Sequence, residues 1–253
     1  MLTAITRKVS PNLASCQLEF LQREPLDVAR AEVQHGDYEA CLERLGVRVV
    51  SLPTEPDLPD CVFVEDPALV LDEIAVITRM GAESRRGESE SLAAALARFR
   101  PLVRMSAPAT LEGGDVVRMG KTLYVGLSRR TNAEGARQLA EIVEPYGYRV
   151  TPVAVTGCLH LKSACCAVSD DTVLANRARF DSRALHCEII DVPAEEPGCA
   201  DVLRIGHTVL VPASFPRTAR LLEKSRCQVE SVDVSELQKA EAGITCMSLV
   251  FDA

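Results

Sequence analysis

A hairpin-like segment that recurs along the chain places the strongest constraint on the fold. Each copy consists of an apolar run, a short polar turn and a second apolar run, and four copies occupy residues 68–79, 115–127, 164–175 and 201–213. A fifth copy would pair residues 247–251 with residues 2–7 and so join the two ends of the chain. Such a pairing would close the repeats into a ring.

The residues that open the five copies are regularly spaced. Asp66, Asp115, Ser163, Asp201 and Cys246 are separated by 49, 48, 38 and 45 positions, a period that is typical of repeat architectures such as propellers. Equivalent ends of the units in a closed ring converge on one central point. The repeats therefore predict that a cysteine, a histidine and several carboxylates, although far apart in the sequence, meet at one site.

Helical patterns separate most of the hairpins, and a short β-type run follows most of the helices. The predicted helices cover residues 26–45, 91–99, 132–144, 216–224 and 235–239, and the predicted third strands cover residues 47–52, 102–105, 149–155 and 228–232. Asn132 is a capping residue, and Pro145 and Gly147 supply a stop signal. Residues 180–191, which precede the fourth hairpin, show no clear helix. We predict one α/β domain, residues 1–253, built of strand-strand-helix-strand units.

Composition narrows the class of function. The net charge of −8 argues against nucleic acid as a partner, because phosphate binding requires a basic surface. No stretch approaches the roughly 20 apolar residues of a membrane span, and residues 1–7 do not read as a signal peptide. Ten cysteines in a long chain without a leader favour reduced thiols, and their spacing does not match a zinc site. We therefore expect a cytoplasmic protein with no membrane or metal partner.

Two residues are candidates for covalent and acid–base chemistry. Cys246 follows a glycine-containing bend and opens a terminal strand, where a thiolate could act as a nucleophile. The alternative is a small buried core residue. His160 alternates with Leu159 and Leu161, so a half-buried strand would place it on the face opposite the leucines. A hydrogen-bonded structural histidine is the alternative there.

Acids and arginines supply candidate ligand groups. Glu112 precedes two glycines, which permit a close approach of the backbone to a ligand, although a simple turn has the same composition. Glu65 and Asp66 interrupt an apolar strand pattern, which favours a ligand role because ionised groups are seldom buried without partners. The arginine pairs at residues 85–86 and 129–130 follow the second strand of successive repeats, where they could bind a carboxylate or lie in solvent.

Six motifs, in order and with compatible spacing across essentially the whole chain, closely resemble those of the dimethylarginine dimethylaminohydrolases. They are Phe63-Val64-Glu65-Asp66, Ser84-Arg85-Arg86-Gly87-Glu88, Leu111-Glu112-Gly113-Gly114-Asp115, Arg130-Thr131-Asn132, Leu159-His160-Leu161-Lys162-Ser163 and Thr245-Cys246. That family belongs to the guanidino-group-modifying superfamily. The resemblance therefore implies a five-fold pseudosymmetric α/β propeller, which agrees with the ring predicted from the repeats.

The resemblance also implies a role for each matching residue. Cys246 would be the nucleophile, His160 the general acid and base, and Glu112 the carboxylate that orients His160. Glu112 would also contact the guanidinium. The other matching residues would bind the substrate: Asp66 at the guanidinium nitrogens, Arg85 and Arg130 at the α-carboxylate, Asp60 at the amino-acid end, and the backbone of Leu18, in a mobile N-terminal loop, at the α-ammonium. Glu65 is a further predicted substrate-binding residue. Residues 15–25 are the candidate lid over this site.

The reaction implied by the resemblance is hydrolysis of asymmetric dimethylarginine or monomethylarginine to citrulline and dimethylamine or methylamine. The Cys246 thiolate would add to the guanidinium carbon of this small-molecule substrate. His160 would protonate the departing amine and then activate a water molecule. No metal or organic cofactor is expected.

Two departures from the family pattern leave the substrate open. The family usually has an amide where this chain has Asp201, and an aspartate where it has Glu241. Either acid could hold an unmethylated guanidinium, so a deiminase of arginine or another guanidino compound is the alternative enzyme. A non-catalytic amino-acid-binding protein is a third alternative. The sequence does not decide between a monomer and a homodimer.

Overall fold

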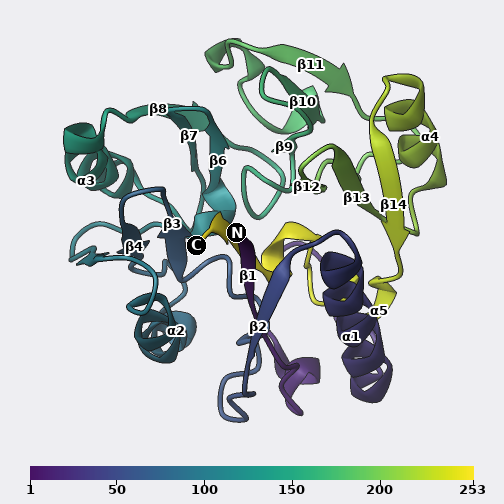
Figure 1. Ribbon diagram of the computed structural model, residues 1–253, viewed down its shortest axis with the longest axis horizontal. Coiled ribbons are helices and arrows are strands. Elements are labelled where there is room, and N and C mark those ends of the chain that lie inside the picture. Colours follow the sequence, from purple (N-terminus) through teal and green to yellow (C-terminus); the bar gives the residue numbers. More distant parts are fainter.

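Fifteen strands form five three-stranded sheets, and the longer helices lie at the periphery (Figure 1). The computed structural model describes residues 1–253. The strands are β1 (Leu2–Arg7), β2 (Arg48–Leu52), β3 (Ala68–Val70), β4 (Ala75–Ile77), β5 (Leu102–Arg104), β6 (Val116–Met119), β7 (Thr122–Leu127), β8 (Arg149–Ala154), β9 (Cys165–Ala167), β10 (Thr172–Ala175), β11 (Glu188–Asp191), β12 (Leu203–Ile205), β13 (Thr208–Pro212), β14 (Gln228–Val232) and β15 (Leu249–Asp252). The helices are α1 (Val28–Arg44), α2 (Ser89–Leu96), α3 (Ala133–Val143), α4 (Pro216–Lys224) and α5 (Ser235–Gln238). The chain is an α/β protein, as the sequence predicts.

All five sheets share one strand order. The middle strands β1, β4, β7, β10 and β13 each pair antiparallel with one neighbour and parallel with the other. A tight turn can join antiparallel strands, whereas parallel strands need a longer crossover. Helices α1 to α4 provide that crossover in four sheets, and two short 3-10 turns, Arg177–Arg179 and Ser182–Ala184, lie in the crossover from β10 to β11. The predicted units are confirmed, including the missing helix before the fourth hairpin.

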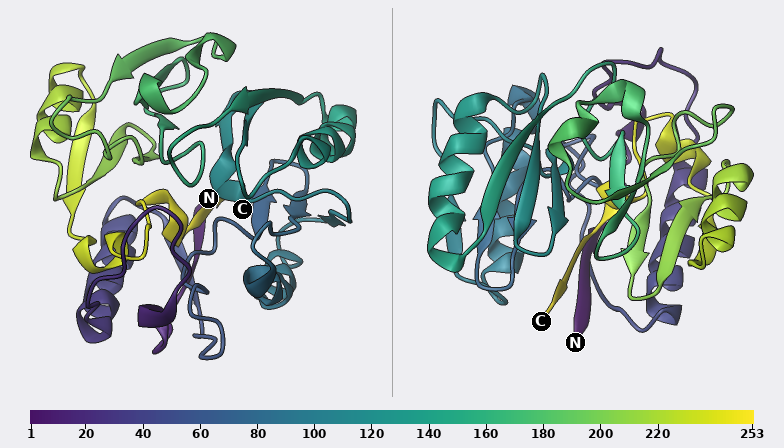
Figure 2. Two further views of the ribbon diagram at one scale, coloured as in Figure 1. Left: turned by 180° about the vertical axis from the view of Figure 1, so that it is seen from behind. Right: turned by 90° about the horizontal axis from the view of Figure 1, so that it is seen from above.

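The two ends of the chain pair with each other, as predicted. β15 lies antiparallel to β1, with Leu2 opposite Asp252 and Ile5 opposite Leu249. Figure 2 shows the two ends side by side, and the Ala253 amide donates a hydrogen bond to the Met1 carbonyl at 3.0 Å. The sheet that follows Cys246 therefore contains strands from both ends of the chain.

Helix α3 illustrates how local sequence sets the elements. The Asn132 side chain accepts a hydrogen bond from the Gly135 amide at 2.7 Å, which satisfies one of the free amides at the helix start. Leu139 and Val143 are fully buried against Val125 of β7, and burial of each such side chain contributes about 1.5–3 kcal/mol. No helix in the structure combines the length and the apolar character needed to cross a membrane.

The strand predicted around His160 is wrong. Residues 157–164 form bends and turns before β9. The Leu161 amide donates to the Asp115 carboxylate at 2.9 Å, and the Lys162 amide donates to the Gly114 carbonyl at 3.0 Å. Because these amides bond to the preceding unit, they cannot form a ladder with a neighbouring strand. His160 and Leu161 are consequently both buried, not placed on opposite faces.

Cys246 does not open a strand either. It lies in the 3-10 turn Thr245–Met247, and β15 begins three residues later, at Leu249.

Candidate active site

Carboxylates tie together the loops that open successive sheets. An acid before the first strand of one unit accepts a hydrogen bond from a backbone amide in the corresponding loop of the next unit. The three bonds are Gly114 to Asp66 at 3.1 Å, Leu161 to Asp115 at 2.9 Å and Thr245 to Asp201 at 2.9 Å. The loops that carry His160 and Cys246 are therefore each fixed by a buried acid from the preceding unit.

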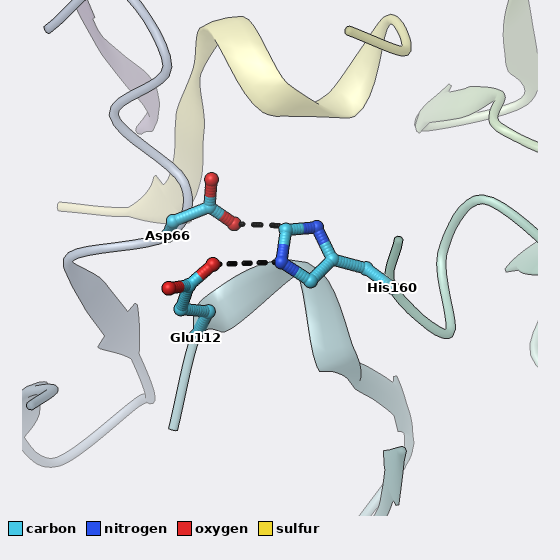
Figure 3. Close-up of side chains that lie close together, drawn as sticks. All are labelled: Asp66, Glu112 and His160. Atoms are coloured by element: carbon cyan, nitrogen blue, oxygen red, sulfur yellow. Dashed lines mark hydrogen bonds and ion pairs between the residues drawn. The ribbon is translucent and has the colours of Figure 1, made fainter. Parts of the chain in front are cut away.

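Asp66, Glu112 and His160 form a buried cluster (Figure 3). His160 Nε2 lies 2.8 Å from the Glu112 carboxylate, and His160 Nδ1 lies 3.8 Å from Asp66 Oδ1. Gly114 packs so closely against the ring that a Cβ there would lie 2.6 Å from Nδ1. Glycine is thus the residue that fits beside an imidazole flanked by two acids.

The two acids favour the protonated form of His160. Burial alone would lower the pKa of His160, but the Asp66 charge and the hydrogen bond to Glu112 outweigh it and raise the pKa to about 9. Burial would raise the pKa of Glu112, yet the hydrogen bond and charge of His160, with two nearby arginines, hold that pKa below its usual value. An imidazolium with a carboxylate partner can act as a general acid.

The same cluster has the residue types of a metal site. Its acids are already paired, however, since Asp66 bonds to Arg85 at 2.8 Å and Glu112 to Arg130 at 3.2 Å. The arrangement is that of an ion-pair network, and we assign no metal to it.

Cys246 is partly exposed in the turn before β15. Its sulfur accepts a hydrogen bond from the Gly243 amide at 3.4 Å. Burial and the nearby carboxylates of Asp201, Glu65 and Asp66 raise the pKa of the thiol well above its usual value. These influences favour the thiol form of Cys246, and a nearby positive charge would favour the thiolate.

A small cavity of about 20 Å³ lies between the Cys246 turn and the His160 loop. Its lining includes six of the nine residues predicted for the site: Asp60, Asp66, Arg85, Arg130, His160 and Cys246. Glu112 reaches the cavity indirectly, through its hydrogen bond to His160.

Two arginines predicted to hold a carboxylate are paired with acids of the protein. Arg85 binds Asp66 through Nη1 at 2.8 Å and grips Glu88 with two bonds of 2.9 Å. Arg130 contacts Glu112 and also bonds to Glu19 from the N-terminal loop. A substrate carboxylate would have to replace one of these acids.

The loop at residues 17–23 covers the site, and Glu241 fastens it. The Glu241 carboxylate accepts hydrogen bonds from the amides of Glu19, Phe20 and Leu21 at 3.0, 2.5 and 2.5 Å. The Gln17 amide bonds to the Asp60 carboxylate at 3.2 Å. These bonds hold the segment that the sequence analysis selected as a candidate lid against Asp60 and Glu241.

Leu18 and Glu65 do not line the small cavity. Leu18 packs against an apolar cluster, and its neighbour Gln17 faces the cavity instead. Glu65 bonds to Lys162 and to the Thr245 hydroxyl and lines a separate cavity of about 470 Å³.

Sequence reasoning did not assign Glu88 or Glu19. Glu88 follows Arg85 by three residues, a spacing at which side chains on one helical turn meet, so the motif itself contained a signal. Glu19 had no local signal, because its partner Arg130 is 111 positions away.

Comparison with known proteins places this site in a defined class. A family model described as arginine deiminase matches residues 53–198, more than half of the chain. The N(G),N(G)-dimethylarginine dimethylaminohydrolase of Pseudomonas aeruginosa is 40% identical over 229 residues, which cover 89% of this chain and 90% of the relative. The enzyme of the same name from Streptomyces coelicolor is 40% identical over 247 residues, 97% of this chain and 95% of the relative.

Solved structures agree with these relatives. The Pseudomonas aeruginosa enzyme in complex with citrulline has a TM-score of 0.94 at 36% identity, over 98% of both chains. The N-terminal domain of ArgZ, an arginine dihydrolase, shares the fold with a TM-score of 0.85 at 16% identity, over 99% of this chain and 98% of that one. The chain belongs to the dimethylarginine dimethylaminohydrolase family.

Proposed function

We propose that this protein hydrolyses Nω-methylated arginines to citrulline and dimethylamine or methylamine. The observation that carries the proposal is that His160, hydrogen-bonded to Glu112, lines the same cavity as Cys246. Two relatives of 40% identity bear the name of that activity, and a structure of one of them holds citrulline.

Cys246 is the proposed nucleophile. A guanidinium bound beside Asp66 adds the positive charge that the thiol lacks and lowers its pKa, so the thiolate forms and its sulfur bonds to the guanidinium carbon. His160, which is protonated below pH about 9, gives its proton to the amine as the C–N bond breaks. The thiol proton has left to solvent when the substrate binds. The neutral imidazole then takes a proton from water, which attacks the same carbon, and as the C–S bond breaks the hydroxyl proton passes to the sulfur, so citrulline and the Cys246 thiol are released.

Substrate binding requires the ion pairs of the closed site to rearrange. Asp66 and Glu112 are the proposed ligands of the guanidinium, and Arg85 and Arg130 are those of the α-carboxylate, to which a guanidinium fork can bond twice. In this scheme the substrate carboxylate takes the place of Glu19 on Arg130. Asp60 and the backbone of Leu18 would bind the α-ammonium, with Glu65 supporting the guanidinium end.

We infer that the five sheets are the blades of a five-fold pseudosymmetric propeller and that residues 1–253 form one catalytic domain. The common strand order of the sheets and the three carboxylate bonds between successive loops support this arrangement. A cytoplasmic location, the absence of a cofactor and of a nucleic-acid partner, and the choice between monomer and homodimer stay predictions from the sequence.

The test is citrulline release from asymmetric dimethylarginine, monomethylarginine and arginine, assayed side by side. We expect turnover of the methylated substrates and its loss in Cys246→Ser, which keeps the size of the side chain but not the thiol. Preference for arginine would reassign the enzyme as a deiminase. Binding of these amino acids without citrulline formation would identify a non-catalytic binding protein.

Arginine deimination is the second candidate, because the matching family model carries that description. An unmethylated guanidinium would be held by a further carboxylate beside Cys246. Asp201 bonds to Thr245 and lies outside the cavity lining, whereas Glu241 lines the cavity with Cys246 and its carboxylate accepts bonds from the amides of residues 19–21. Because Glu241 is already bonded to these amides and Asp201 does not line the cavity, the geometry favours the methylated substrates.

A further inference from the structure

Two buried carboxylates meet at a single hydroxyl next to Cys246. Thr245 Oγ1 lies 2.7 Å from Glu65 Oε2 and 3.2 Å from Asp201 Oδ2. The other oxygen of Asp201 accepts a hydrogen bond from the Thr245 amide at 2.9 Å. Asp201, Glu65 and Thr245 are all less than one-tenth exposed, so solvent does little to screen the two acids from each other.

The Thr245 hydroxyl has one proton and cannot donate to both carboxylates. The shorter contact assigns that proton to Glu65. Thr245 Oγ1 then presents only lone pairs to Asp201 Oδ2, and that contact is a hydrogen bond only if Asp201 itself carries a proton. Ionisation of both acids would leave two acceptors facing each other in a buried site.

The surrounding charges select which acid is protonated. Lys162 bonds to Glu65 and lies near Asp201 without bonding to it. Four further titratable groups near Asp201 are uncharged, since burial raises the pKa of each of them: Cys166, Cys199, Cys246 and Tyr38. Glu65 therefore has a cationic partner and Asp201 has none.

We infer that Asp201 is a neutral carboxylic acid that donates a hydrogen bond to the Thr245 hydroxyl and thereby positions the turn that carries Cys246. The donors run in one direction, from Asp201 to Thr245 to Glu65, and the Glu65 carboxylate is balanced by Lys162. Burial, followed by the Glu65 charge, raises the pKa of Asp201 to about 7, which agrees with this assignment.

Ionisation of Asp201 affects Cys246 in two ways. The hydroxyl of Thr245 loses its donor, which loosens the turn, and the new charge opposes formation of the thiolate because Asp201 is among the acids that raise the pKa of Cys246. This consequence rests on the proposed function, whereas the proton on Asp201 does not. Asp201 is accordingly a positioning residue and not a catalytic one.

The protonation of Asp201 is tested by thermal unfolding of the wild type and of Asp201→Asn, without substrate, over a range of pH. Asparagine keeps an acceptor for the Thr245 amide and a donor for its hydroxyl, but it cannot ionise. Aspartate in the unfolded chain ionises at a pH of about 4, whereas folded Asp201 keeps its proton up to a pH of about 7. Between these values ionisation favours the unfolded wild type, so the Tm of D201N minus that of the wild type should rise and then level off.

A Tm difference that is constant with pH, or that falls as pH rises, would overturn the assignment. Asp170→Asn is the matched control, because the Asp170 side chain is 95% exposed, and its Tm difference should not show this rise. If D201N does not fold, NMR of the wild type with labelled aspartate γ-carbons replaces it. One resonance, identified by its change in Thr245→Val, should then titrate with a pKa of about 7. Titration of that resonance at an ordinary aspartate pKa would refute the protonation of Asp201.

The consequence for Cys246 is tested separately by kcat/KM for asymmetric dimethylarginine. At pH values above the pKa of Asp201, kcat/KM of D201N should exceed that of the wild type. At pH values below it, the two proteins should have similar kcat/KM. A parallel decline of both proteins would refute the effect on Cys246. If the Tm difference rises as predicted but the protein releases no citrulline, the protonation of Asp201 is supported and the proposed function is refuted.

Discussion

At the scale of single residues, His160 links stability to pH. Its pKa rises from about 6.5 in the unfolded chain to about 9 in the folded protein, so the folded state binds the proton more tightly. This stabilisation is fully present below the unfolded value and is lost as pH rises through the folded value.

We expect the difference in free energy of unfolding between the wild type and His160→Gln to shrink by about 3 kcal/mol over that interval, as measured by urea denaturation. His35→Gln is the control, because burial lowers the pKa of His35 to about 4 and leaves it neutral throughout. A constant difference for His160→Gln would mean that His160 is neutral in the folded protein.

Gly243 is a position where an added methyl group cannot be accommodated without a shift of its neighbours. A Cβ there would lie 1.9 Å from Asp201 Cγ, so Gly243→Ala must push the Cys246 turn away from its anchoring acid. We expect a fall in Tm and at least a tenfold loss of kcat/KM, since overpacking of this kind costs about 1–3 kcal/mol. Gly36→Ala, where nothing lies within 4 Å of the added Cβ, should keep full activity and gain slightly in stability. Equal behaviour of the two variants would contradict the close packing at Gly243.

The sequence predicted which residues gather at the site better than it predicted what they bond to. The motifs selected Asp66, Arg85 and Cys246, and all three line one cavity. The bond between Arg130 and Glu19 could not be foreseen, because it joins segments 111 positions apart and depends on how the N-terminal loop packs on the site. Local sequence patterns do not predict contacts between residues so far apart in the sequence.

At the scale of elements, one acid holds the N-terminal loop at residues 19–21. Because Glu241 accepts bonds from the amides of Glu19, Phe20 and Leu21, Glu241→Ala should release the segment. A bond to a charged acceptor contributes about 1.5–3 kcal/mol, so hydrogen exchange at these amides should accelerate at least tenfold by mass spectrometry. Glu134→Ala, on the surface of α3, should leave that exchange unchanged. Unaltered exchange in Glu241→Ala would show that other contacts hold the lid.

Elements with complete local signals were predicted correctly, whereas the His160 loop was not. Helix α3 has a cap, a periodic apolar face and a stop, and each of these acts within a few residues. The segment around His160 has an alternating pattern typical of a strand, but the Asp115 carboxylate captures the Leu161 amide. A tertiary bond from another unit overrides the local preference there.

At the scale of the whole molecule, the core is shared between units. One apolar cluster combines Ala4 of β1, Leu42 of α1, Leu210 of β13 and Val232 of β14. Another joins Val117 and Tyr124 of the β6–β8 sheet to Val173 of β10. Because each sheet contributes to a cluster with a neighbour, no sheet could keep its apolar face buried alone.

The pairing of β1 with β15 also sets the order of events during folding. Closing a loop costs more entropy as its length grows, and non-local pairings slow folding. Since β15 follows the Cys246 turn and pairs Leu2 with Asp252 across the whole chain, we expect this pairing to form late. On refolding from urea, the helical circular dichroism signal should therefore recover before citrulline release, and joining the two ends with a short peptide should shorten the delay. Simultaneous recovery of the two signals in the wild type and in the protein with joined ends would contradict this order. The order makes the turn at Cys246 one of the last parts of the protein to form.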